Sequence, residues 1–327
     1  MEVSQAPEPE YRARLAIAAR VAAGCAAVEP VAAALVVGST ALRRCSERAD
    51  LDLVLLSAGP IALARFESRD VDGVRVELER LTTDEALAAT TGTGWVWELR
   101  AGARLGANVP VLDPGGWGER LASRAASMRP PSHRVEAVLR GVYLRLAGIR
   151  GADDQMDAVR GCLDNLVLLA LLEGPRRYQK AKWALADLLH AGEHALVDCV
   201  LAAYGVDSGD AAASQRTIDG AADLVGRVYA DAAIPSHDAI LALGHTPEFA
   251  EASYVSRCLD DAGDLHQSGR FVEAQYVAKF AARLAALGLG DGAGTAALFP
   301  AEEPAAELLD AVLSATDARR QTLEASA

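Results

Sequence analysis

The sequence predicts an α+β protein with two domains, a strand-bearing domain over residues 1–126 and an all-helical domain over residues 127–327. Three observations lead to this prediction. Short apolar and alternating segments, which are typical of strands, occur almost entirely before residue 126. After that point, long helical patterns punctuated by glycine and proline dominate. The 327 residues are also enough for two domains of ordinary size.

The elements of the first domain follow from local patterns. Alanine, leucine and arginine at helical spacing predict a helix from Glu10 to about Val28. The segment Val71–Leu81 alternates strictly, so we expect one half-buried strand with Glu77 on its polar face. The remaining expectations are a buried strand over Ala32–Gly38, a turn and one helical stretch over 39–49, a strand over Asp50–Leu56, a helix capped by the segment Thr82–Glu85, and a short strand and turn over 108–116.

The second domain is predicted to contain only helices. Alanine and leucine carry most of its apolar content, and both residues favour helices. Glycine and proline separate the helical patterns, as at Gly174-Pro175 and at Pro300. The expected helices span about 134–149, 155–173, 178–204, 217–230, 249–267, 271–287 and 302–324.

Composition limits the classes of partner. The net charge is −13, which makes the chain a poor candidate for holding nucleic acid by its phosphates. Such charge suits a cationic small substrate better, although it can also simply keep the protein soluble. The N-terminus lacks a signal pattern, and no apolar run is long enough to span a bilayer. Five scattered cysteines without a CxxC spacing indicate reduced thiols. We therefore expect a cytoplasmic protein without a membrane partner, and a homodimer is left open.

The most informative residues are Asp50, Asp52 and Glu77. Residues two apart on a strand share a face, so Asp50 and Asp52 should point the same way. Two adjacent carboxylates repel each other unless a cation joins them, and Mg²⁺ prefers such oxygen ligands together with substrate phosphates. Glu77, on a nearby predicted strand, could supply a third ligand. Three carboxylates of this kind can hold two metal ions for an in-line phosphoryl displacement.

A glycine-serine pair precedes these carboxylates. Gly38 ends a predicted strand, and glycine lets a backbone approach a phosphate closely. Free N–H groups at the start of the next helical segment bind anions, and Ser39 could add a hydroxyl donor.

The spacing of Gly38-Ser39, ten residues and then Asp50-Leu-Asp52-Leu resembles the nucleotidyltransferase superfamily related to DNA polymerase β, with Glu77 at the position of its later carboxylate. The segments Val76–Leu78 and Leu112–Trp117 are also similar to the kanamycin type of aminoglycoside nucleotidyltransferase. The resemblance covers residues 30–126 with useful specificity and the rest only in architecture. One departure is Arg43-Arg44, where many members have a glycine.

The resemblance implies a mixed-sheet catalytic domain over 1–126 and a helical substrate- and nucleotide-binding domain over 127–327. It implies transfer of a nucleoside monophosphate from an NTP such as ATP to a hydroxyl of a small acceptor, in which antibiotic modification is one form. Asp50, Asp52 and Glu77 would be catalytic and hold two Mg²⁺ ions. The nucleotide would be bound by Gly38 and Ser39, with Arg43, Arg44, Lys180 and Lys182 as secondary phosphate contacts. The general base is not assigned: Glu136 and Asp164 are both candidates.

Other interpretations stay open. One is a nucleotide-binding regulator or antitoxin-like module that nucleotidylates or binds a partner protein. Another is a template-independent polymerase acting on RNA, which the lack of a basic surface disfavours. The segment His190–His194 spells H-x-x-E-H, a pattern of zinc peptidases, but Gly192 weakens a helix there, so a polar helix end is expected. The glycine-rich segment Gly288–Gly294 follows a predicted helix and indicates a linker.

Overall fold

The computed structural model describes residues 7–44, 49–149, 155–174, 180–206, 209–230, 252–286, 298–299 and 306–325. The chain divides into two compact units. The first contains Met1–Pro131, and the second contains Ser132–Gly174 and Lys180–Ala327. The described residues are mostly helical and include one five-stranded sheet with both parallel and antiparallel pairs. The fold class is therefore α+β, as predicted.

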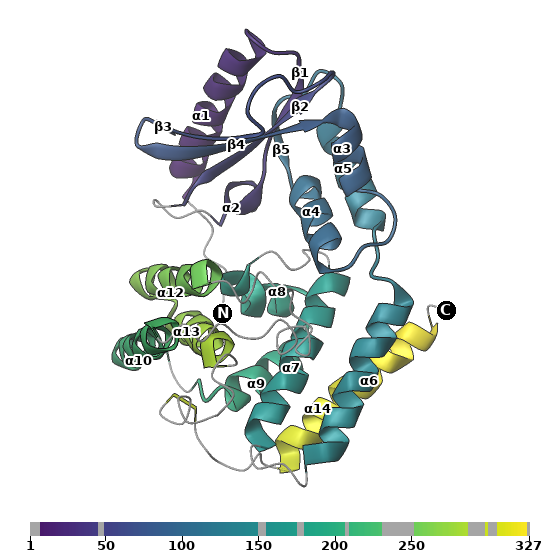
Figure 1. Ribbon diagram of the computed structural model, residues 1–327, viewed down its shortest axis with the longest axis vertical. Helices are drawn as coiled ribbons and strands as arrows, with labels where there is room; N and C mark the ends of the chain where they lie inside the picture. Colours follow the sequence, from purple (N-terminus) through teal and green to yellow (C-terminus); the bar gives the residue numbers. More distant parts are fainter. Residues whose placement is uncertain are drawn as a thin grey trace. The chain divides into compact units, whose positions relative to one another are not determined.

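The sheet lies in the first unit with strand order β3-β4-β2-β1-β5 (Figure 1). β2 and β4 are parallel, whereas the other neighbouring pairs are antiparallel, so the sheet is mixed. The strands are β1 (Val31–Val36), β2 (Leu51–Ser57), β3 (Phe66–Val71), β4 (Val74–Thr82) and β5 (Val109–Leu112).

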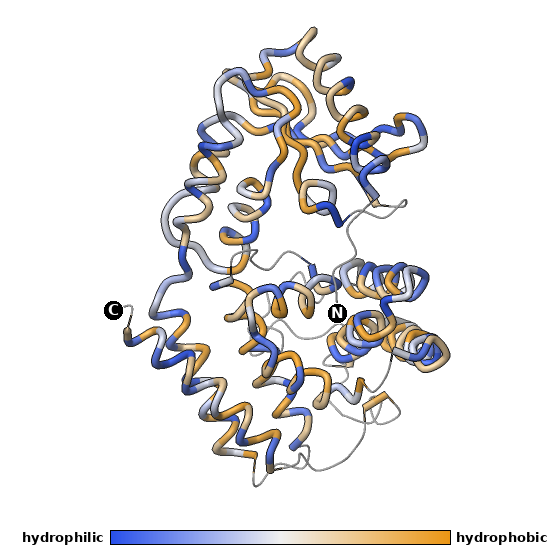
Figure 2. The backbone as a smooth tube through the Cα atoms, turned by 180° about the vertical axis from the view of Figure 1, so that it is seen from behind, coloured by the Kyte–Doolittle hydropathy of each residue, from blue (hydrophilic) through white to orange (hydrophobic). Residues whose placement is uncertain are grey.

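Helices cover the two faces of this sheet through separate apolar clusters. Along β2, Leu51, Leu53 and Leu55 point to the face that packs on α1 (Glu8–Ala26). The alternate residues Val54 and Leu56 pack on the other face. That face is covered by α3 (Thr83–Ala89), α4 (Val96–Gly106) and α5 (Trp117–Ser127). The central strands are accordingly the most hydrophobic part of this unit in Figure 2.

The predicted strand over Val71–Leu81 is wrong only at its start, because the chain turns at Asp72-Gly73 and the strand begins at Val74. Asp72 and Gly73 both have positive φ, 53° and 77°, which is the signature of a type I′ turn. The turn joins β4 to β3, an edge strand that the sequence analysis missed. The predicted alternation within β4 is confirmed: Val76 and Leu78 are buried on the α1 side, and Glu77 lies on the opposite face.

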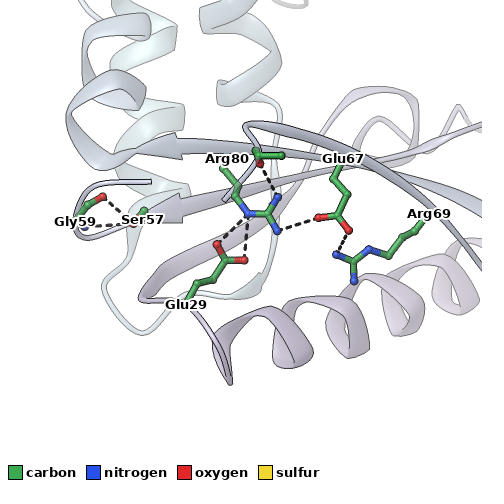
Figure 3. Close-up of polar contacts among 7 residues, drawn as sticks. Glu29, Ser57, Gly59, Glu67, Arg69 and Arg80 are labelled. Carbon is green, nitrogen blue, oxygen red and sulfur yellow. Dashed lines mark hydrogen bonds and ion pairs between the residues drawn. The ribbon is translucent and has the colours of Figure 1, made fainter. Parts of the chain in front are cut away.

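A buried arginine links β3 and β4 to the loop after α1 (Figure 3). Arg80 is 3% exposed, and its Nε donates to both carboxylate oxygens of Glu29 at 3.2 and 2.9 Å. Its Nη2 donates to Glu67 at 3.1 Å, and its Nη1 donates to the carbonyl of Ala64 at 2.8 Å. Arg69 also donates a hydrogen bond to Glu67 through its Nη2. Arg80 thus finds its partners on the loop after α1, on β3 and on the segment before β3.

Side chains cap two of the helices that follow strands. Thr82 accepts from the backbone N–H of Glu85 at 3.1 Å, and Glu85 accepts from the backbone N–H of Thr82 at 2.8 Å, which is the predicted N-cap in the form of a capping box. Asp113 accepts from the N–H groups of Trp117 and Gly118 at 2.7 and 2.8 Å, which satisfies the first turn of α5.

The described part of the second unit is helical. α7 is buried from Val159 to Leu172 and forms the centre of one helical group. The predicted helix over 178–204 is wrong in part, because Gly192 at φ 84° divides it into two helices after a short 3₁₀ turn. The elements are α6 (Ser132–Gly148), α7 (Gln155–Glu173), η2 (Ala181–Trp183), α8 (Ala184–His190), α9 (His194–Ala203), α10 (Ala211–Ala230), α12 (Ala252–Gln267), α13 (Phe271–Ala286) and α14 (Ala306–Ala325).

A buried polar network ties α7, α9 and α13 together. Asp164 accepts from the hydroxyl of Tyr204 at 2.6 Å and pairs with the guanidinium of Arg283. Lys279 donates to the carbonyls of Tyr204 and Gly205 at 2.7 and 2.8 Å, just past the end of α9. Lys279 thus satisfies carbonyls that a helix end leaves without an internal partner. Among the described helices, none combines the length and apolarity needed to cross a bilayer.

Candidate active site

Asp52 and Glu77 are paired in register on neighbouring parallel strands. Asp52 on β2 lies opposite Glu77 on β4, so both side chains project from the same face of the sheet. Neighbouring strands are about 4.8 Å apart, which brings the two side chains side by side. Both are accessible, with side-chain exposures of 22% and 44%. The sequence predicts these carboxylates on nearby strands, and the structure brings them together.

Asp50 lies one residue before β2 begins and is exposed. It is two residues from Asp52, and the expectation that both side chains point the same way assumes that the alternation of β2 extends to Asp50. The register of β2 with β4 starts at Leu51, so Asp50 has no paired position on β4. Its role as a ligand stays a prediction.

The close approach of Asp52 requires a glycine at position 38. Its φ of +68° is one that residues with a side chain rarely adopt. A Cβ atom added here would lie 3.1 Å from Cγ of Asp52 and closer still to Oδ2. The two segments are also joined by a hydrogen bond of 3.0 Å from the N–H of Val37 to the carbonyl of Asp52. The glycine of the Gly38-Ser39 pair therefore lets the turn lie directly against the aspartate.

The other residues near this turn that the sequence predicts to bind phosphate make different contacts in the structure. Ser39 is half-buried in the short helix α2 (Gly38–Ala41). Arg43 pairs with Glu8 at 3.0 Å and stacks on the ring of Tyr11 at 4.3 Å. Arg44 is buried, with 4% exposure. In this conformation Arg43 is engaged with α1, so binding a triphosphate would require it to change partners.

Lys180 and Lys182 belong to the second unit. Lys180 is exposed and immediately precedes η2. Lys182 forms an ion pair with Asp261 of α12 and has 16% side-chain exposure. Lys182 therefore has a structural partner within its own unit, and a phosphate role for either lysine stays a prediction.

Arg104 and Glu79 were not predicted as site residues. Arg104 on α4 has its Nη2 3.7 Å from Oδ1 of Asp52 and pairs through Nη1 with Glu79. Glu79 follows Glu77 by two residues on β4 and therefore shares the face of Asp52. The position of Glu79 two residues after Glu77 was a signal in the sequence. Arg104 had no such signal, because it lies 52 residues beyond Asp52 in the chain.

The donor set at this face suits a divalent cation by its chemistry. Asp52 and Glu77 are paired in register, and carboxylates are ligands that Mg²⁺ prefers. The turn at Gly38 leaves room for the carboxylate of Asp52. Among the residues that the structure describes, no group of three or more His, Cys, Asp or Glu side chains is gathered as a metal site needs. The structure therefore supplies Asp52 and Glu77 as a pair, and a third ligand and a second ion stay predictions.

The candidates for a general base have other partners. Asp164 is buried between Tyr204 and Arg283, which makes it a poor acceptor for a substrate proton. Glu136 is exposed on α6 and pairs with Arg140 at 2.8 Å. The base is therefore not assigned.

The H-x-x-E-H segment is a polar helix end, as expected. His190 ends α8, Gly192 interrupts the helix, and His194 begins α9. Glu193 pairs with Arg319 of α14. The two histidines therefore do not share a helix as a zinc-peptidase motif requires. The glycine-rich segment Gly288–Gly294 lies outside the described residues.

Few known proteins are similar to this chain. No family model matches the chain, and no curated protein matches it. Among solved structures, a nucleotidyltransferase-like protein from Exiguobacterium sibiricum 255-15 has 11% sequence identity and a TM-score of 0.32, over 57% of this chain. The match spans 65% of that protein, less than two thirds of its length.

Proposed function

We propose that the protein is a magnesium-dependent nucleotidyltransferase that transfers a nucleoside monophosphate from an NTP to a hydroxyl group of a small molecule. The observation that supports the proposal most is the pairing of Asp52 with Glu77 in register, beside the turn at Gly38 whose conformation requires glycine. This combination offers carboxylates for a divalent cation and a close backbone approach for phosphates on one face of one sheet.

In the proposed reaction, an oxygen of the acceptor attacks the α-phosphorus of the NTP. The bond from that phosphorus to the oxygen that bridges to the β-phosphate breaks, and pyrophosphate leaves with the electron pair. The hydroxyl proton passes to a base that is not yet identified. Bound Mg²⁺ supplies stabilisation of the charge on the attacking and leaving oxygens.

Each residue has a proposed task in this reaction. Asp50, Asp52 and Glu77 hold the Mg²⁺ ions. The sequence predicts two such ions. Gly38 and Ser39 seat the β- and γ-phosphates through backbone N–H groups and a hydroxyl. The secondary phosphate contacts remain those predicted from the sequence, Arg43, Arg44, Lys180 and Lys182.

The acceptor is proposed to be a small hydroxylated molecule. The net charge of −13 favours a cation such as an aminoglycoside, because long-range attraction raises the rate of encounter. The same charge disfavours tRNA or another nucleic acid, which would have to overcome repulsion between its phosphates and the protein.

The test is incubation of the purified protein with each NTP labelled at the α-phosphate, Mg²⁺, and in separate reactions a panel of aminoglycosides, tRNA or cell protein. The proposal expects label in a small molecule and loss of at least about 100-fold of the rate in Asp52→Asn and in Glu77→Gln. Asp70→Asn is the matched control, because it removes an exposed carboxylate from the neighbouring edge strand, where Asp70 lies opposite Arg75.

The outcomes separate the alternatives. Label in protein would favour the antitoxin-like module, and label in RNA would favour a polymerase. Full activity in both Asp52→Asn and Glu77→Gln would refute the assignment of the metal-binding residues. No transfer to any acceptor in the presence of Mg²⁺ would count against a nucleotidyltransferase.

A further inference from the structure

Arg104 presents a guanidinium group beside the candidate metal ligand Asp52. Its Nη2 lies 3.7 Å from Oδ1 of Asp52, which is an ion pair but longer than a hydrogen bond. Its side chain is 31% exposed, so the group is neither buried nor fully solvated. The cation therefore lies at the edge of the site, close enough to act on whatever binds Asp52.

Glu79 holds this guanidinium in place. It pairs with Nη1 of Arg104 and is itself only 16% exposed. Glu77 and Glu79 share a face of β4 but differ in surroundings: Glu77 is 44% exposed beside Asp52, and Glu79 is covered near α4. The two glutamates therefore have different partners: Glu77 pairs with the exposed Arg75 at 3.4 Å, and Glu79 pairs with Arg104.

We infer that the Glu79–Arg104 pair binds a phosphate group of the substrate next to Asp52, an inference that rests on the proposed function. Arginine has five N–H donors in a planar fork that matches phosphate oxygens, and Glu79 engages only one of its nitrogens. A donor already held in position costs little to orient when negative charge develops. Arg104 is the phosphate-binding residue, and Glu79 is its positioning residue.

The test measures binding and does not depend on turnover. Isothermal titration calorimetry follows the four α,β-methylene NTPs and inorganic tripolyphosphate in the presence of Mg²⁺. The variants are Arg104→Ala, Arg104→Lys and Glu79→Gln. Arg20→Ala is the matched control, because it removes the same charge from the exposed pair of Arg20 with Asp72. Thermal unfolding of every variant reports whether it is folded.

We expect Arg104→Ala to weaken binding of the analogue and of tripolyphosphate by about 10- to 100-fold relative to Arg20→Ala. Arg104→Lys should recover part of the affinity, because it keeps the charge but loses the fork. Glu79→Gln should weaken binding although the positive charge remains. This last result would not follow from net charge alone.

Two outcomes would overturn the inference in different ways. If the wild type binds an analogue and Arg104→Ala and Glu79→Gln bind it like Arg20→Ala, the pair only fastens α4 to β4. A lower unfolding temperature in both variants with unchanged binding would show the same. If the wild type binds neither an analogue nor tripolyphosphate, the proposed function fails together with the inference.

Discussion

Gly38 and Asp52 fit against each other so closely that a Cβ on the glycine would lie 3.1 Å from the carboxylate carbon. The hydrogen bond from Val37 to the carbonyl of Asp52 fixes the same two segments through the backbone. The turn and the strand therefore cannot move apart to accommodate a larger residue without breaking this bond. One contact constrains both residues. The effects of substitutions at the two positions on the free energy of unfolding should therefore not be additive.

Gly38→Ala should lower the free energy of unfolding of the first unit by about 2–3 kcal/mol, from the cost of a positive φ and from the collision with Asp52. In an Asp52→Ala background the same change should cost only about 1 kcal/mol, because the collision is gone. Urea unfolding followed by tryptophan fluorescence in a Trp183→Phe protein reports on the first unit, since the other three tryptophans lie there. Equal costs in both backgrounds would show that Asp52 is not in contact with the turn.

Arg80→Met should destabilise the first unit by about 3 kcal/mol. The side chain is 3% exposed, and its loss leaves the carboxylate of Glu29, at 15% exposure, without its bidentate partner. Arg69→Met is the matched control, because Arg69 contacts the same network from a position 38% exposed and should cost less than about 1 kcal/mol. The same fluorescence assay measures both. A similar loss in the two variants would mean that burial of Arg80 contributes nothing.

The Glu67 carboxylate should make the first unit sensitive to acid. Burial raises its pKa, but hydrogen bonds and charge from Arg80 and Arg69 outweigh this effect, and the net pKa is lowered. A lowered folded pKa contributes stability that is present above the unfolded value of about 4.3 and is lost as the pH falls through the folded value. In Glu67→Gln the decline of stability below about pH 4.3 should be shallower. An unchanged slope would contradict the assignment.

Much of the fold was predictable because local patterns determined it. The alternation in β4 placed Glu77 opposite the buried Val76 and Leu78, and the structure confirms that arrangement. The hairpin was also encoded, since Asp72-Gly73 is a strong turn signal, but in the strand before it exposed and half-buried residues alternate and the apolar content is low. The contact of Arg104 with Asp52 could not be predicted, because it depends on how α4 packs on the sheet.

Asp164→Asn should destabilise the second unit by about 2–3 kcal/mol and leave the chemistry of each folded molecule unchanged. The carboxylate pairs with a buried Arg283, and neutralising it leaves that guanidinium with Asp157, at 2.9 Å, as its remaining carboxylate partner. Burial and the charge of Asp164 also raise the pKa of Tyr204 well above its usual value, so the hydroxyl donates as a neutral group. Chemical unfolding measures the loss of stability of the second unit. A rate that collapses in fully folded Asp164→Asn protein would restore Asp164 as a candidate base.

The cysteines offer a test of packing in both units. Cys25, Cys162, Cys199 and Cys258 are all buried and free, while Cys45 lies outside the described residues. Burial raises the pKa of all four, to about 11 for Cys162 and to about 12 for Cys258. Thiolate is the reactive form, so these thiols should be inert at pH 8 for two reasons, low access and low ionisation.

In a Cys45→Ser protein we therefore expect almost no reaction with Ellman's reagent at pH 8, and four thiols per chain after addition of urea. Because the folded pKa values are raised, the associated stability is fully present below the unfolded value of about 8.5 and declines as the pH rises through the folded values. Labelling at pH 10 should thus become faster by more than the increase in thiolate alone, since opening of the core is favoured as well. Rapid labelling of one thiol at pH 8 would show that its part of the core opens readily, and separate Cys25→Ser and Cys258→Ser variants would locate that opening in the first or the second unit.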